Sequence, residues 1–209
     1  MLPRPTLKIV EVFASVQGEG LRQGEPTIFV RFSGCNLRCA FCDTKYAWTA
    51  GKERTREEVL AEVRRLRADF PAAWVCLTGG EPLLQDISGL VRDLKKEGLK
   101  VQAETNGTVD RILAVDWYTV SLKPPEYVVQ PRFLKTAKEV KLVVNRELNL
   151  DIVRRVRKGF PPVTPIILQP ESNRRRSAAK AMEILQQGLK GGLENLRVSA
   201  QLHKVLGIK

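Results

Sequence analysis

The chain has 209 residues, 43% of them hydrophobic, and its 35 Lys and Arg against 23 Asp and Glu give a formal net charge of +12. This length supplies one sizeable core, and the absence of a run of roughly 18 to 20 apolar residues or of a secretory signal leads us to expect a cytoplasmic protein without a membrane span. The positive charge attracts anions, nucleic acid included, but it is spread over helical faces without interleaved aromatic residues, so a solvated basic surface explains it about as well.

Short β-branched runs alternate with helical patterns along the chain. Strands are expected at 26–32, 73–80, 99–107, 116–125, 138–145 and 164–171, and helices at 55–70, 83–97, after Asn149, and at 174–188. Thr55 with Glu58 resembles a capping box, while Gly98 and Gly188 stand where helices would end. Such alternation predicts βα units around a mostly parallel sheet in a single domain spanning 1–209.

The chain is too short for a complete (β/α)8 barrel, which takes about 250 residues, so we expect an α/β fold with a partial, open (β/α)6-type barrel of about six strands. The proline-rich segments 121–133 and 160–166 read as loops, because neither shows a helical period. Polar clusters follow the strands: "SGC", "TGGEP", "ETNGT", "SLKPP" and "LQPES". Since ligand chemistry gathers at the carboxyl ends of parallel strands, these clusters predict one ligand site.

Three of the four cysteines, Cys35, Cys39 and Cys42, lie within the segment "CNLRCAFC". Cys76 falls in an apolar strand, where a buried thiol is expected, and His203 is the only histidine. Structural zinc prefers four closed ligands, which this loop does not offer. An iron–sulfur cluster held by three thiolates keeps one iron open for a small molecule, so the loop favours a catalytic cluster.

This loop resembles the C-x3-C-x2-C loop of the radical S-adenosylmethionine (SAM) enzymes, with Phe41 just before the third cysteine. Together with "QGEG", "FVRFSGCNLRCAFCDTKYAW", "TGGEPLLQ", "ETNGT", "SLKPP" and "RVSAQLHKVLGI", nearly the whole chain is similar to the 7-carboxy-7-deazaguanine synthase family. The resemblance implies a carbon–nitrogen lyase of the queuosine and 7-deazapurine pathway, which serves tRNA modification, with a 4Fe-4S cluster on the three cysteines and SAM on the open iron.

The resemblance also implies which residues contact SAM. Glycines in "TGGEP" let the backbone approach a ligand closely, and Glu81 offers an acceptor to an ammonium group, although two glycines after a strand also suit an ordinary turn. The implied SAM contacts are Phe41, Asp43, Gly80, Glu81, Glu104, Ser121, Leu122, Lys123, Gln169, Pro170, Glu171 and Ser172. The alternative for the polar ones is a loop end that satisfies its own backbone.

The implied substrate is 6-carboxy-5,6,7,8-tetrahydropterin, a flat ring with many donors and acceptors and one carboxylate. Its implied contacts are Val16, Gln17, Gly18, Glu19, Arg31, Thr78, His203 and Lys209, in an N-terminal substrate loop and a C-terminal tail that close over the active site. Arg31 suits a bidentate pair with the carboxylate. Strand alternation does not settle whether Arg31 faces inward or outward.

Magnesium is a further implied cofactor, and Thr44, directly after the cluster loop, is its implied protein ligand, with Asp43 assisting or merely stabilising the loop. One protein oxygen is reasonable because Mg²⁺ keeps several waters. A threonine that caps its own turn is the alternative. The implied reaction contracts the pterin ring, expels ammonia and recycles SAM.

Implied partners are a second copy of the chain in a homodimer, the pterin, and an external reductant of the flavodoxin or ferredoxin type, with neither membrane nor nucleic acid required. Two other functions stay open from the residues. One is another radical SAM enzyme that activates a glycyl-radical protein, and the other is a zinc-stabilised nucleic-acid-binding module that uses the +12 charge.

Overall fold

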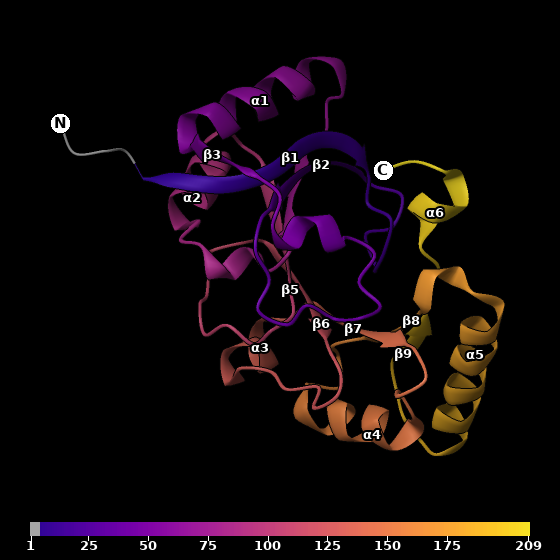
Figure 1. The fold of residues 1–209 in the computed structure, drawn as a ribbon. Coiled ribbons are helices and arrows are strands. Elements are labelled where there is room, and N and C mark those ends of the chain that lie inside the picture. The colour runs from indigo at the N-terminus through magenta and orange to yellow at the C-terminus, as the bar shows by residue number, and fades with distance from the viewer. Residues whose placement is uncertain (1–4) are drawn as a thin grey trace. The chain divides into compact units, whose positions relative to one another are not determined.

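The computed structural model describes residues 5–209. The described chain divides into two compact units, whose strands and helices are labelled in Figure 1. Unit 1 comprises residues 5–16, 25–105 and 111–117, and unit 2 comprises residues 17–24, 106–110 and 118–209. Each unit has its own strands and its own covering helices.

Unit 1 orders its strands β3-β1-β2-β4-β5. β2, β4 and β5 run parallel, whereas β1 pairs antiparallel with both β2 and β3. The bounds are β1 Thr6–Val16, β2 Pro26–Phe32, β3 Lys52–Thr55, β4 Trp74–Gly79, β5 Lys100–Thr105, α1 Arg56–Asp69 and α2 Ser88–Lys96, with short 3-10 turns η1 Lys45–Trp48 and η2 Pro82–Leu84. α1 packs against β1 and α2, and α2 packs against β5.

The helix boundaries of unit 1 follow local chemistry. The capping box that begins α1 is confirmed, since the Glu58 N–H donates to Thr55 Oγ1 at 3.2 Å and the Thr55 N–H donates to Glu58 Oε2 at 2.6 Å. The expected start of the next helix at Leu83 is wrong, because Leu83 belongs to η2 and α2 begins five residues later. Just before α2, the Asp86 carboxylate accepts from the Ser88 N–H at 3.1 Å and from the Ser88 hydroxyl at 2.7 Å.

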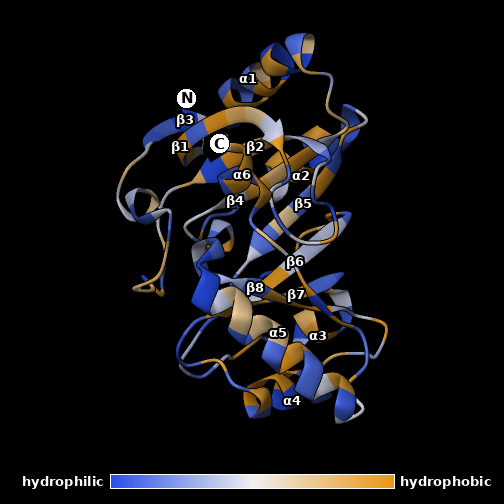
Figure 2. Ribbon diagram, turned by 90° about the vertical axis from the view of Figure 1, so that its right-hand side faces the viewer, coloured by the Kyte–Doolittle hydropathy of each residue, from blue (hydrophilic) through white to orange (hydrophobic). Residues whose placement is uncertain are grey.

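Unit 2 orders its strands β6-β7-β8-β9, and each neighbouring pair is parallel. The bounds are β6 Trp117–Leu122, β7 Glu139–Val144, β8 Ile166–Pro170, β9 Leu196–Val198, α3 Pro131–Thr136, α4 Leu150–Gly159, η3 Glu171–Asn173, α5 Arg175–Lys190 and α6 Leu202–Leu206. α5 packs against β7, β8, β9 and α4, and Figure 2 shows both hydrophobic and hydrophilic residues on α4 and α5, as expected of helices covering a sheet.

Two expectations for unit 2 are wrong. α5 does not end at Gly188 but at Lys190, and Gly188 is buried inside it, where a side chain would meet Leu196 of β9 at 2.6 Å. The segment 121–133, expected to be a loop without helix, contains the start of α3 at Pro131. In the first case glycine serves close helix–strand packing rather than helix termination.

The expected α/β class with an open, mostly parallel sheet is confirmed. Within residues 5–209, β3 pairs only with β1 and β9 only with β8, so the strands do not close into a barrel. Strands β1, β3 and β9 bring the total to nine in this part of the chain, against about six expected. No helix among these residues is long and apolar enough to cross a bilayer.

Candidate active site

The cysteine loop lies in unit 1 between β2 and η1. Cys35, Cys39 and Cys42 are free thiols, and all are partly exposed. The Cys42 N–H donates to the Cys39 carbonyl at 3.0 Å, and the Thr44 N–H donates to Cys42 Sγ at 3.4 Å. A backbone N–H that donates to a ligand sulfur is a feature of iron–sulfur sites, so the loop is suited to metal ligation. Cys76 is buried in β4, as expected.

The number of thiols in the loop fits a cluster with one open iron better than a structural zinc ion. In the part of the chain that the structure describes, no three His, Cys, Asp or Glu side chains gather around a common metal position. The cysteines of a 4Fe-4S cluster each bind a different iron, so three thiols in one loop leave the fourth iron open. The zinc alternative needs four ligands converging on one point.

The glycines of "TGGEP" bring the end of β4 against the cysteine loop. Gly79 has φ +126°, and a side chain there would overlap the backbone of Phe32, while one at Gly80 would overlap the carbonyl oxygen of Gly34. The Gly80 N–H donates to the Phe32 carbonyl at 3.0 Å. The two glycines therefore let the end of β4 pack closely against the backbone that begins the cysteine loop. A contact of Gly80 with SAM stays a prediction.

Glu81 has a structural role at the same place. Its side chain is fully buried, and Oε1 accepts from the Leu83 N–H at 3.1 Å and from Thr105 Oγ1 at 2.9 Å. The predicted contact with an ammonium group is untested. Nearby, Thr78 Oγ1 lies 3.5 Å from Glu104 Oε2, which brings a predicted substrate contact next to a predicted SAM contact.

Arg31 faces a set of side chains that hold its guanidinium. Nε donates to Glu11 Oε1 at 2.8 Å across the β1–β2 pair, and the side chain is 16% exposed. The guanidinium carbon lies 5.4 Å from the ring centroid of Phe13 and 5.9 Å from that of Tyr46. The Tyr46 hydroxyl also donates to Glu11 Oε1, at 2.8 Å. Neither Nη atom has a hydrogen-bond partner within residues 5–209, so this edge is suited to receive a carboxylate.

Thr44 does not cap its own turn. It stands at the N-cap of η1, yet its side chain makes no capping hydrogen bond. Instead Oγ1 donates to Asp43 Oδ1 at 3.0 Å. A hydroxyl beside a carboxylate is an oxygen pair of the kind that Mg²⁺ accepts.

The remaining predicted SAM contacts lie in unit 2. Ser121 and Leu122 end β6, and Lys123 Nζ donates to Ser121 Oγ at 2.7 Å. Both amide atoms of Gln169, on β8, are buried and have no hydrogen-bond partner in residues 5–209. An amide left unsatisfied at both ends is the state expected of a side chain whose partner is a bound molecule, which fits SAM.

Of the predicted SAM contacts after Gln169, Glu171 and Ser172 already have hydrogen-bond partners within the protein. Pro170 is buried at the end of β8. Glu171 Oε1 accepts from Arg174 at 2.7 Å, and the hydroxyl of Ser172 accepts from Lys204 Nζ at 3.2 Å. Phe41, on the cysteine loop in unit 1, is partly exposed.

The predicted substrate loop and tail are joined within unit 2. Gln17 is buried, and the Leu202 N–H donates to the Gly18 carbonyl at 2.8 Å. A side chain at position 18 would overlap the imidazole of His203, so glycine lets the loop lie directly against that ring. Lys209 is exposed at the chain end, and Val16 ends β1 in unit 1.

Four residues of these surroundings were missed by sequence reasoning. Glu11 and Tyr46 hold Arg31 in unit 1, and Glu139 and Lys141 of β7 hold the substrate loop in unit 2. The only sequence signal was in "EVKLVV", where Glu139 and Lys141 are two positions apart in a strand that is otherwise apolar. Both charges are buried, and a buried charge requires a partner.

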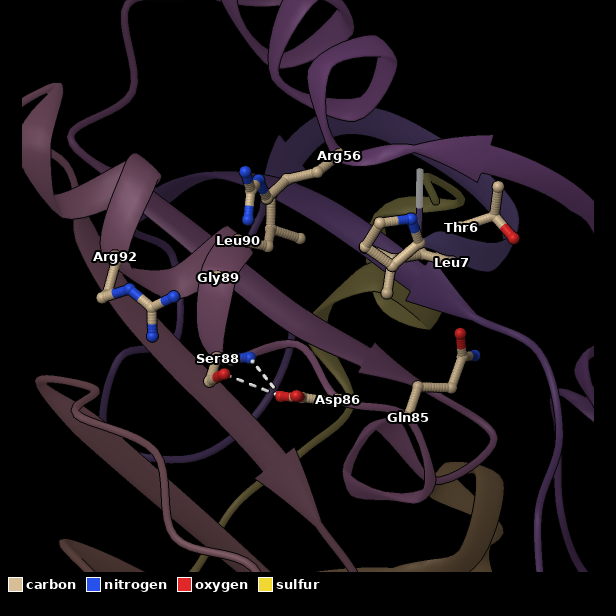
Figure 3. A pocket seen from close by; sticks show the side chains of 10 residues that line it. Thr6, Leu7, Arg56, Gln85, Asp86, Ser88, Gly89, Leu90 and Arg92 are labelled. Atoms are coloured by element: carbon tan, nitrogen blue, oxygen red, sulfur yellow. Dashed lines mark hydrogen bonds between the residues drawn. The ribbon is translucent and has the colours of Figure 1, made fainter. Parts of the chain in front are cut away.

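A cavity of about 370 Å³ in unit 1 is separate from these residues. Figure 3 shows it lined by side chains from β1, the start of α1, and α2 with its preceding turn, including Arg56, Asp86 and Arg92. No predicted cluster, SAM or substrate contact lines it. It is therefore not the candidate site.

Comparison with known proteins decides the family. Residues 29–179 match the model of the radical SAM superfamily. The 7-carboxy-7-deazaguanine synthase of Aquifex aeolicus is 35% identical over 208 residues, covering 95% of this chain and 93% of that protein. The enzyme of that name from Methanospirillum hungatei is also 35% identical, over 97% of this chain and 86% of its own length. The chain belongs to the 7-carboxy-7-deazaguanine synthase family.

The solved structures agree with this family. QueE from Escherichia coli superposes with a TM-score of 0.80 at 29% identity, over 95% of both chains. The radical SAM match spans the cysteine loop, "TGGEP" and Gln169, and implies a 4Fe-4S cluster and SAM as cofactors of this 7-carboxy-7-deazaguanine synthase family member. The two alternative functions, a glycyl-radical activase and a zinc-stabilised nucleic-acid-binding module, do not explain why the similarity to these synthases extends along nearly the whole chain.

Proposed function

We propose that this radical SAM enzyme converts 6-carboxy-5,6,7,8-tetrahydropterin to 7-carboxy-7-deazaguanine and ammonia, with Mg²⁺, for queuosine and other 7-deazapurine biosynthesis. The conversion is a ring contraction with loss of ammonia and involves no net oxidation, so SAM acts as a recycled cofactor. The observation that carries the proposal is the arginine of β2: Arg31 is held through Nε and presents a free Nη edge that suits the carboxylate of such a pterin.

Cys35, Cys39 and Cys42 hold the cluster in this proposal, each through one sulfur. When bound, the cluster and SAM supply a one-electron cleavage that yields a carbon radical able to remove a substrate hydrogen. The protein orients SAM: Ser121 and Lys123 offer a hydroxyl and an ammonium, and the buried amide of Gln169 offers a donor and an acceptor that are otherwise unsatisfied.

The pterin is held by polar groups of the chain. Arg31 binds its carboxylate, while Gln17, Gly18 and Glu19 of the substrate loop address the donors and acceptors of the ring. His203 of the tail lies against Gly18 and adds a ring nitrogen. Together these groups orient the substrate and exclude water from it, which is the protein's share of radical catalysis.

Thr44 supplies one oxygen to Mg²⁺, and Asp43, whose carboxylate already accepts from the Thr44 hydroxyl, assists. Mg²⁺ keeps most of its waters, so a site with few protein ligands agrees with its coordination chemistry. The proposed role of the ion is to neutralise charge on the substrate while the ring rearranges.

Residues 1–209 act as a single radical SAM domain in this proposal, with the substrate loop and tail closing over the pterin. The enzyme works in the cytoplasm as a homodimer and receives electrons from a flavodoxin-type or ferredoxin-type protein. Nucleic acid is not required for the reaction, because the proposed substrate is a free small molecule.

An anaerobic assay tests the proposal. The protein with reconstituted cluster is incubated with SAM, dithionite, Mg²⁺ and the carboxytetrahydropterin, and products are identified by mass spectrometry. We expect 7-carboxy-7-deazaguanine and one ammonia per turnover, and none from the Cys39→Ala variant. SAM cleavage in the wild-type protein without any deazapurine product would contradict the proposed substrate while leaving the family assignment intact.

A further inference from the structure

A buried ion pair in unit 2 has no part in the function described so far. Lys141 Nζ on β7 pairs with Glu19 Oε2 of the substrate loop, and the two side chains are only 7% and 15% exposed. Burying two charges costs desolvation energy that their attraction often fails to recover, so an ion pair of this kind is a weak source of stability. Its presence at a predicted substrate contact points to a role in orienting that contact.

The pair connects the substrate loop to the C-terminal tail. Glu19 Oε1 accepts from Gln201 Nε2 at 2.6 Å. The next residue, Leu202, donates its N–H to the Gly18 carbonyl, and Gln23 Nε2 donates to the Ala200 carbonyl at 2.7 Å. The carboxylate of Glu19 is therefore a common acceptor for strand β7 and for the base of the segment that carries His203.

A second acidic residue of β7 fixes the same loop two positions before Lys141. Glu139 is fully buried; its Oε2 accepts from the Leu21 N–H at 2.6 Å and its Oε1 accepts from Thr119 Oγ1 at 2.6 Å. Gly20 has φ +72°, and a side chain there would overlap the Glu139 carboxylate. Residues two apart in a strand share a face, so Glu139 and Lys141 grip the loop from one face of β7.

We propose that Lys141 is a positioning residue for pterin binding. This inference rests on the proposed function. By holding Glu19 as an oriented carboxylate, Lys141 presents an anionic acceptor to the N–H donors of the aminopyrimidinone part of the ring. Because Glu19 also accepts from Gln201, fixing Glu19 joins the C-terminal tail to the substrate loop. The loop and His203 then form one binding surface. Lys141 itself contacts the substrate only through Glu19.

Enzyme kinetics test the proposal with Lys141→Met, Lys141→Arg and the matched control Lys138→Met, an exposed lysine directly before the same strand. We expect the KM for the pterin to rise by at least about tenfold in Lys141→Met, with a smaller change in kcat and partial recovery in Lys141→Arg. Iron content and SAM affinity stay at wild-type levels. A KM within about twofold of wild type, or equal losses of kcat in both methionine variants, overturns the inference.

A double-mutant cycle separates positioning from misfolding. Lys141→Met leaves a carboxylate buried without its ammonium, whereas adding Glu19→Gln removes both charges. If Lys141 acts through Glu19, the double variant has a KM no higher than the worse single variant. Effects on KM that multiply show that the two residues act separately and overturn the inference.

Hydrogen–deuterium exchange gives a readout that needs no turnover. In Lys141→Met, amides of residues 17–24 and 199–204 are expected to exchange together at least about tenfold faster than in wild type, and in Lys138→Met they are not. Unchanged exchange overturns the inference even if the wild-type enzyme makes the proposed product. If no product forms, the proposed function fails, and exchange still decides whether Lys141 holds the loop and tail.

Discussion

Tyr46→Phe is a narrow perturbation of the candidate carboxylate site. It deletes one hydroxyl and keeps the ring whose centroid lies 5.9 Å from the Arg31 guanidinium carbon. The hydroxyl donates to Glu11 Oε1 at 2.8 Å, and Glu11 accepts from Arg31 Nε at the same distance. Without this donor, Glu11 loses one of the contacts that fix its carboxylate beside Arg31. The variant therefore tests whether Arg31 has to be pre-positioned to bind substrate.

The size of the effect follows from the bond that is lost. A hydrogen bond to a charged acceptor contributes about 1.5–3 kcal/mol, and the lower end applies because Tyr46 is half exposed. About 1.4 kcal/mol corresponds to a tenfold change in an equilibrium constant, so we expect the pterin KM to rise about tenfold. The turnover number is expected to change by less than about threefold, because a contact made equally to the bound substrate and to the transition state affects KM rather than kcat.

The pH dependence provides a further check. Burial, and then the hydrogen bond to Glu11, raise the pKa of Tyr46 above its ordinary value. The raised pKa means that the folded protein favours the protonated hydroxyl of Tyr46. The hydrogen bond from this hydroxyl to Glu11 is therefore fully present below about pH 10 and is lost only as the pH rises through the folded pKa. The KM ratio of variant to wild type is therefore flat from about pH 6.5 to 9. A KM equal to wild type, or a loss confined to kcat, would refute the reasoning.

Three other variants test the cluster loop, the magnesium ligand and a buried hydroxyl. Gly80→Ala forces a methyl group into the backbone that begins the cysteine loop, so we expect less iron per chain after reconstitution. In the control variant Gly98→Ala the added methyl meets no atom, so this variant is expected to keep its iron and to lose about 1 kcal/mol of stability. Thr44→Ala should weaken activation by Mg²⁺ at unchanged iron content, and an unaltered Mg²⁺ titration would exclude Thr44 as a ligand. The Tyr127 hydroxyl is buried without a partner among residues 5–209, and burial raises its pKa to about 12. Tyr127→Phe should therefore raise the unfolding free energy by up to about 1 kcal/mol below pH 10, measured by urea titration.

The parts of the fold set by local pattern were predictable. The capping box at Thr55 and the N-cap at Asn149 are sequence-local devices, and both begin helices as expected. β1 was missed although it is the longest strand of the described chain, because "TLKIVEVFASV" mixes polar and apolar residues and most of it is only partly buried. Gly188 was misread because its reason is contact with β9, which no local pattern records.

The candidate site divides in the same way. The cysteines and glycines are recognisable from type and spacing, since ligation and close backbone approach demand those residues. Glu11 and Lys141 act by pairing across long sequence separations, and their partners become visible only once β1 meets β2 and the substrate loop meets β7. A charge in a strand reads as an exposed position until the fold shows it buried.

The same pairing explains why the net charge of +12 says little about the chemistry. The two cations predicted to organise the pterin site, Arg31 and Lys141, are each held by a carboxylate and are largely buried, whereas the ion-paired arginines Arg64 and Arg65 are mostly exposed on the solvated surface. A substrate with one carboxylate and many neutral polar groups requires directed hydrogen bonds more than a strong field, and paired cations supply direction with little net charge. Pairing rather than net charge is therefore what fixes the orientation of these two binding groups.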